Sequence, residues 1–129
     1  WHPAKVFLGD VGSVPLGFIL GWLLLRLTGE GLWAAAIILP LYYFLDATIT
    51  LLHRTVKREK IWEAHRGHFY QRAVQRGLSH GTVSSAVALN NVVLIGLALY
   101  SVRNPWAALI AALVITVFFL GYYRGGKKA

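Results

Sequence analysis

Four long apolar stretches, separated by polar segments, dominate the 129-residue chain and predict four transmembrane helices. They comprise about residues 14–27, 32–52, 82–100 and 106–123. A helix needs about 20 apolar residues to cross a hydrocarbon core of ~30 Å. The first stretch covers only about 20 Å at ~1.5 Å per residue, so we expect its entrance to be recessed. The expected fold class is all-α integral membrane, with residues 1–129 as part of one polytopic domain.

Two residues interrupt the apolar pattern of the second stretch. Pro40, near its middle, predicts a kink. Asp46 stands about seven residues, or roughly 10 Å, before the basic end that begins at His53, so it lies within the membrane. An ionisable group at this depth is either functional or paired with a neighbouring helix, and the sequence leaves both readings open.

The third and fourth stretches contain residues suited to helix packing. Asn90 and Asn91 lie near mid-membrane, where an amide without a partner is unfavourable, so at least one is expected to face another helix. Ala108 and Ala112 are four residues apart and form a small-residue face. These positions predict close contacts within the bundle.

The polar segment 53–81 fixes the expected orientation of the chain. It contains seven lysines and arginines against two glutamates, and therefore most of the chain's net charge of +8. The positive-inside rule makes this segment cytoplasmic, and crossing back through two spans places residues 9–13 on the same face. Because the cations cluster between apolar spans, we expect anionic headgroups rather than nucleic acid as their partners.

Composition supports a membrane protein and narrows the site chemistry. With 57% hydrophobic residues and a mean hydropathy of +0.55, the chain is too apolar for an ordinary soluble domain of its size. It contains no cysteine, which excludes a disulfide framework and a thiolate metal site.

Residues 61–78, within the polar segment, have the periodicity of an amphipathic helix. The apolar face comprises Phe69, Tyr70, Ala73, Val74 and Leu78, and the polar face comprises His68, Arg72 and Arg76. This pattern predicts a cytoplasmic interfacial helix, and binding of anionic lipid would explain it without an enzymatic role.

The sequence Gly-Asp-Val-Gly-Ser at residues 9–13 predicts a turn that leads into the first membrane helix. Ser13 stands where an N-cap belongs, and Pro15 fits the first helical turn. The free N–H groups of a helix N-terminus attract phosphate, and Asp10 is an oxygen ligand of the kind that Mg²⁺ accepts together with substrate phosphates. The residues are compatible with a magnesium diphosphate site, or with a capped helix in which Asp10 only shapes the turn.

The wider sequence context resembles a known family. The run Pro3–Gly17 is similar to a signature of the polyprenyl-phosphate N-acetylhexosamine-1-phosphate transferases (glycosyltransferase family 4), integral membrane enzymes that join a nucleotide sugar to a lipid phosphate. His65-Arg66-Gly67-His68 resembles that family's histidine-rich cytoplasmic loop. Gly67 departs from the pattern, because the most similar members carry a histidine there.

The resemblance implies an activity: transfer of a sugar-1-phosphate from a UDP-N-acetylamino sugar to polyprenyl (undecaprenyl) phosphate, with release of UMP. It implies dependence on Mg²⁺, with Mn²⁺ as a substitute, and a place in cell-wall or lipopolysaccharide biosynthesis at the bacterial plasma membrane. The implied catalytic residues are Asp10, His65 and His68, with Asp10 also the metal ligand. The implied substrate-binding residues are Lys5, Gly9, Gly12, Ser13 and Arg66. Two histidines are too few ligands for a zinc site.

One part of the family's pattern has no match in this chain. The family carries a pair of aspartates, whereas the only aspartates here are Asp10 and Asp46. We expect that pair upstream of Trp1, in a missing N-terminal part of the same enzyme, so that these 129 residues alone would be inactive. The alternative function is a non-enzymatic membrane module that binds anionic lipid or a partner through the basic helix. A transporter fragment ranks lower, and a homodimer stays open.

Overall fold

The computed structural model describes residues 9–57, 74 and 77–125. These residues form helices and the turns between them, with no strand. The helices are α1 (Gly9–Gly29), α2 (Trp33–Ile38), α3 (Leu41–Val56), α5 (His80–Tyr100) and α6 (Pro105–Gly125). In α1, α5 and α6 the apolar run is long enough to cross a membrane. The predicted all-α membrane architecture is thus confirmed for these three helices, while a fourth span formed by α2 and α3 together stays a prediction.

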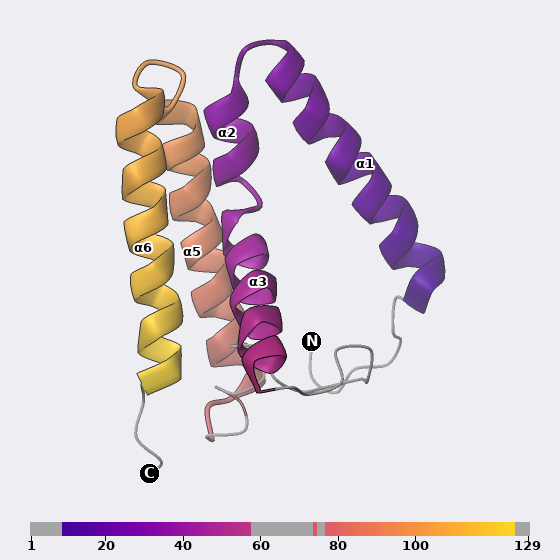
Figure 1. Ribbon diagram of the computed structural model, residues 1–129, viewed down its shortest axis with the longest axis vertical. Coiled ribbons are helices and arrows are strands. Elements are labelled where there is room, and N and C mark those ends of the chain that lie inside the picture. The colour runs from indigo at the N-terminus through magenta and orange to yellow at the C-terminus, as the bar shows by residue number, and fades with distance from the viewer. Residues whose placement is uncertain (1–8, 58–73, 75–76, 126–129) are drawn as a thin grey trace.

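Helices α1 and α5 run in one direction, and α2, α3 and α6 run in the opposite direction (Figure 1). Their ends therefore lie at two levels. The N-terminus of α1, the C-terminus of α3, the N-terminus of α5 and the C-terminus of α6 lie at one level, which we call the Asp10 end. The turns between α1 and α2 and between α5 and α6 lie at the other level, which we call the Arg26 end. This arrangement agrees with the predicted return of the chain to one face after each pair of spans.

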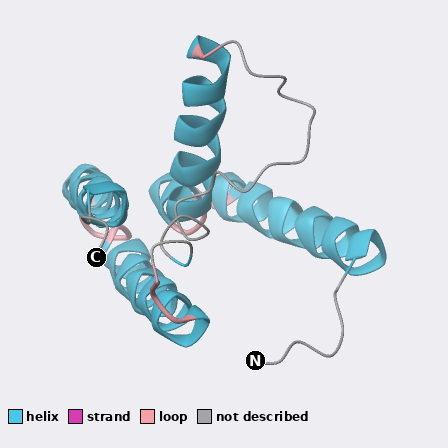
Figure 2. Ribbon diagram, turned by 90° about the horizontal axis from the view of Figure 1, so that it is seen from below, coloured by secondary structure: helices cyan, strands magenta, loops and turns pink. Residues whose placement is uncertain are grey.

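Helix α1 stands apart from the other helices. It packs on α2 near the Arg26 end and leans away from the bundle toward the Asp10 end (Figures 1 and 2). None of its 21 residues is buried. Its apolar side chains are therefore open to lipid or to other protein along most of the helix.

The expected turn at residues 9–13 is wrong, because these residues form the first part of α1. Gly9 enters the helix with φ +59°, a conformation that L side chains rarely adopt, and Asp10 in the first turn interacts favourably with the helix dipole. Ser13 is consequently not the N-cap, and Pro15 lies inside the helix, where it removes one backbone hydrogen bond. With 21 residues α1 is about 31 Å long rather than about 20 Å, so the length argument for a recessed entrance does not hold.

The second apolar stretch is interrupted where the sequence predicts a kink. Leu39 and Pro40 form a turn between α2 and α3. Pro40 has no N–H to donate to the Ala36 carbonyl, so the helical hydrogen-bond ladder cannot continue through this point. The break separates the stretch into two helices, and α3 continues to Val56, beyond the predicted end at residue 52.

The core lies where α2 and α3 pack against the α5–α6 hairpin. Ala108 and Ala112 are completely buried, which confirms the predicted small-residue face. The Tyr42 and Phe119 rings meet edge to face with their centroids 5.7 Å apart. The core of the bundle thus combines small residues, which allow helices to pack closely, with an edge-to-face aromatic pair.

The two asparagines of α5 both face protein. Asn90 is buried, and the Asn91 Nδ2 donates a hydrogen bond to the Tyr43 hydroxyl at 3.0 Å. The prediction that at least one of them faces another helix is confirmed. The hydrogen bond joins α5 to α3 within the apolar layer.

Helix α5 begins two residues earlier than predicted. The Ser79 side chain accepts a hydrogen bond from the Thr82 N–H at 3.0 Å, which makes Ser79 the N-cap and His80 the first helical residue. Most of the predicted interfacial helix at 61–78 lies outside the described residues, so it stays a prediction.

Candidate active site

Asp10 is held at the start of a membrane helix. Its carboxylate is exposed in the first turn of α1, next to Gly9, Gly12 and Ser13. The N–H groups of a first helical turn have no acceptor within the helix and give that end a partial positive charge. Although the local structure is a helix start rather than the expected turn, it still offers N–H donors and one carboxylate at the same place.

A polar face of α3 leads toward the same end of the molecule. Asp46, Thr50 and Arg54 are spaced four residues apart, and all three are buried. The Thr50 Oγ1 donates a hydrogen bond to the Asp46 Oδ1 at 3.4 Å. This bond gives Asp46 a neutral partner within its own helix, and it leaves open whether Asp46 also has a functional role.

The burial of Arg54 was not foreseen from the sequence, which indicated only a cation of the polar segment. The signal that could have revealed it is the spacing Asp-x3-Thr-x3-Arg, which places all three polar side chains on one helix face. Arg54 lies in the last turn of α3, near the Asp10 end. It therefore adds a positive charge beneath the surface there.

The charges at the Asp10 end are mainly basic among the described residues. Lys57 at the C-terminus of α3 and His80 at the start of α5 are exposed, and His53 is half-buried. Together with Arg54 they surround the two ends of the polar segment with positive or titratable groups. Such an environment attracts phosphate.

Several predicted site residues lie outside the described residues: Lys5, His65, Arg66 and His68. Their approach to Asp10 stays a prediction. The structure does place the helix ends that flank the polar segment at the Asp10 end (Figure 1). The topology thus brings the start of α1 and the helix ends that flank the polar segment to one face of the molecule.

The described residues can offer a metal ion one exposed carboxylate at this end. They contain no group of three or more histidine, aspartate or glutamate side chains that could hold an ion by themselves. Mg²⁺ is commonly bound by one or two carboxylates together with substrate phosphates and water. Asp10 beside the free N–H groups of the first helical turn fits this kind of site.

Comparison with known proteins gives two matches. Residues 1–28 match the family model described as Glycosyl transferase family 4. A Bacillus subtilis (strain 168) protein described as a "Probable undecaprenyl-phosphate N-acetylglucosaminyl 1-phosphate transferase" is 30% identical over 84 residues. That alignment covers 62% of this chain and 24% of the relative, so the chain spans about a quarter of the relative's length. No solved structure matches the chain.

The structure shows a helical protein with three helices long and apolar enough to cross a membrane, and with an exposed carboxylate in the first turn of one of them. Both matches are to the same class of enzyme, so the chain is similar to glycosyl transferase family 4 over its first 28 residues and to a transferase named for undecaprenyl phosphate over 84 residues. The matched segment includes the whole of the Gly9–Ser13 motif and most of α1.

Proposed function

We propose that the whole protein transfers a sugar-1-phosphate from a UDP-N-acetylamino sugar to polyprenyl phosphate and releases UMP. The observation that carries this proposal is Asp10 in the first turn of a membrane helix, within the segment that matches the family. The name of the Bacillus subtilis relative supports the choice of a polyprenyl phosphate acceptor. We further propose that the reaction serves cell-envelope glycan synthesis at the cytoplasmic face of a bacterial plasma membrane.

The proposed reaction exchanges one phosphoryl linkage for another. An oxygen of the lipid phosphate attacks the phosphorus that carries the sugar, and the bond from that phosphorus to the bridging oxygen breaks. UMP leaves with the bridging oxygen, while the lipid gains a diphosphate-linked sugar. The bond between the sugar and its own phosphate oxygen stays intact, so the configuration of the sugar does not change.

Each candidate residue of this chain would have a separate role in binding the phosphates or in donating hydrogen bonds or a proton to them. The first-turn N–H groups from Gly9 onward would orient phosphate oxygens, and Ser13 would add a hydroxyl one turn further along. Lys5 and Arg66 would neutralise charge on the phosphates. His65 and His68 would donate hydrogen bonds or a proton to the phosphate oxygens.

Asp10 would hold Mg²⁺ beside the diphosphate, and Mn²⁺ could replace it because both ions accept oxygen ligands. When bound, the ion would withdraw charge from the phosphate oxygens and so favour release of UMP. The exposed position of Asp10 leaves space for phosphate oxygens and water in the remaining ligand positions.

A direct assay tests the proposed function. The full-length protein is mixed with a UDP-N-acetylamino sugar, undecaprenyl phosphate and Mg²⁺, and UMP release is measured. We expect Asp10→Asn to lower the rate by about a hundredfold or more, because a neutral amide would hold Mg²⁺ much less tightly beside the diphosphate. Asp10→Glu keeps an oxygen ligand and should retain part of the activity.

The control is Arg103→Gln, which removes one charge from the turn at the Arg26 end and should leave the rate unchanged. Full Mg²⁺-dependent activity in the Asp10→Asn variant would show that the metal role is wrong. Absence of UMP release with every common UDP-amino sugar would refute the transferase and favour the lipid-binding module.

A further inference from the structure

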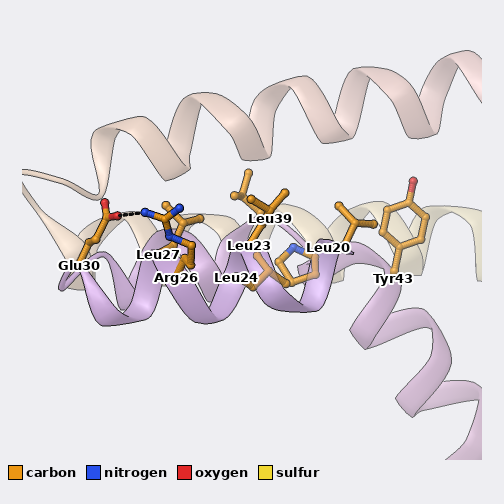
Figure 3. A pocket seen from close by; sticks show the side chains of 9 residues that line it. Leu20, Leu23, Leu24, Arg26, Leu27, Glu30, Leu39 and Tyr43 are labelled. Atoms are coloured by element: carbon orange, nitrogen blue, oxygen red, sulfur yellow. Dashed lines mark hydrogen bonds and ion pairs between the residues drawn. The ribbon is translucent and has the colours of Figure 1, made fainter. Parts of the chain in front are cut away.

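A hollow lies between α1 and the α2–α3 break, near the Arg26 end of the molecule. Figure 3 shows the side chains that line it, and its volume is about 530 Å³. Leu20, Leu24 and Leu27 line it from α1, and Leu39 and Tyr43 line it from the break. The hollow is therefore an apolar groove of the size that small ligands occupy in proteins.

The length of the groove corresponds to one membrane leaflet. It runs along α1 from Leu20 and ends at Glu30, just past the C-terminus of the helix, ten residues further on or about 15 Å at ~1.5 Å per residue. This is half of a hydrocarbon core of ~30 Å. A chain that fills the groove would thus reach from the mid-membrane level to one membrane surface.

The groove ends in two opposite charges. Arg26 and Glu30 lie at the end opposite Tyr43, with the Arg26 Nη2 3.4 Å from the Glu30 Oε1 (Figure 3). Both side chains are 60% exposed. The Arg26 guanidinium also lies 5.3 Å from the centre of the Trp22 ring, which helps to hold it at the groove mouth. So loose and exposed an ion pair can open for a ligand that supplies both charges.

Aromatic residues mark this end as a membrane surface. The Trp33 ring meets the Trp106 ring with their centroids 5.1 Å apart, at the starts of α2 and α6. Tryptophan is enriched at the headgroup level of membranes. Arg26 and Glu30 at the neighbouring end of α1 therefore lie where lipid headgroups lie.

We propose that this groove binds one chain of a zwitterionic phospholipid, with its phosphate on Arg26 and its ammonium group on Glu30. The charge pair selects the headgroup, because an anionic lipid without an ammonium group would leave Glu30 beside a negative charge. The headgroup lies at the opposite end from Asp10, and the groove is one leaflet long. The site is therefore separate from the proposed reaction centre and does not depend on transferase activity.

Native mass spectrometry of the delipidated full-length protein tests this proposal. Phosphatidylethanolamine and phosphatidylglycerol with identical acyl chains are supplied in equal amounts. We expect about two- to fivefold more bound phosphatidylethanolamine, the range that exposed ion pairs support. Glu30→Gln should abolish the preference, and Arg26→Gln should weaken binding of both lipids.

The groove itself is tested with a matched pair of variants. Leu24→Trp places an indole in the groove and should lower binding of both lipids, whereas Leu25→Trp, at a 73% exposed position outside the groove, should not. The proposal is wrong if the unaltered protein retains both lipids equally, or if Glu30→Gln keeps the preference. A photo-crosslinking amino acid at position 24 provides a further test. If it crosslinks to protein instead of lipid, another segment fills the groove and the proposal is wrong.

Discussion

Thr50 shows how a single hydroxyl can stabilise a carboxylate inside an apolar bundle. Asp46 and Thr50 are both buried on α3, and the hydroxyl donates to the carboxylate at 3.4 Å. A side chain such as Asp46 is unfavourable in the membrane unless it has hydrogen-bond partners. Thr50 therefore contributes to stability through its neighbour as well as through its own packing.

Thr50→Val keeps the shape of the side chain and removes this donor. We expect the free energy of unfolding to fall by about 1 kcal/mol, because hydrogen bonds within membranes are worth about that much and this one is long. Unfolding of the purified full-length protein in detergent, followed by circular dichroism, measures the change. Thr48→Val is the matched control, since Thr48 is exposed on the same helix. An equal loss in both variants would contradict the role assigned to the hydrogen bond.

At the residue scale, the sequence predicted that Asp46 lies away from water but did not predict the surroundings of Arg54. Asp46 is buried, as expected for a carboxylate seven residues inside an apolar run, while its depth in a membrane stays a prediction. Arg54 follows the apolar run, where an arginine normally extends to the surface. Its burial depends on how α3 packs against other elements, and periodicity along one helix does not specify that packing.

At the scale of elements, α6 is fixed to its neighbours by its small residues. Ala108 is completely buried in the core, whereas Ala107 on the same turn is exposed. A small residue at this contact allows two helix backbones to approach closely. The contact is therefore sensitive to side-chain volume at one position and insensitive at the next.

Ala108→Leu should lower the free energy of unfolding by about 1–3 kcal/mol, because the larger side chain has no space in a packed core. Ala107→Leu adds the same volume on the exposed side and should change stability by less than about 0.5 kcal/mol. Thermal unfolding of the two variants of the full-length protein in the same detergent provides the comparison. If the two variants lost the same stability, close packing at Ala108 would not be the reason.

The elements were predicted better in their interiors than at their ends. Pro40 specifies a break because its ring prevents a backbone hydrogen bond in any context. Gly9 and Gly12 indicated a turn, but glycine also occurs in helices when a favourable first-turn charge such as Asp10 is present. The start of α1 was thus decided by weak competing preferences, and those are what local sequence resolves least well.

At the scale of the whole molecule, the alternation of helix directions determines which loops share a face. Glu30 and Arg103 are exposed in the turns at the Arg26 end, and Lys57 is exposed at the Asp10 end. The absence of cysteine from the sequence means that one introduced cysteine reports on its own position alone. This makes the orientation of the full chain accessible to chemical labelling wherever the whole protein also lacks reactive thiols.

We expect Glu30→Cys and Arg103→Cys to react with a membrane-impermeant thiol reagent in intact cells. Lys57→Cys should react only after the membrane is permeabilised, because the basic end is expected on the cytoplasmic side. Labelling is measured by the mass shift of the purified protein. Reaction of Glu30→Cys and Lys57→Cys from the same side would show that α2 and α3 together do not cross the membrane.

The break at Pro40 interrupts the hydrogen-bond ladder, so the packing of α2 helps to set the direction in which α3 leaves it. Four of the six residues of α2 are buried: Ala34, Ala35, Ala36 and Ile38. Rotation of α2 about its own axis would move these side chains out of the bundle and lose their packing contacts. The buried face of α2 therefore sets the azimuth from which α3 departs.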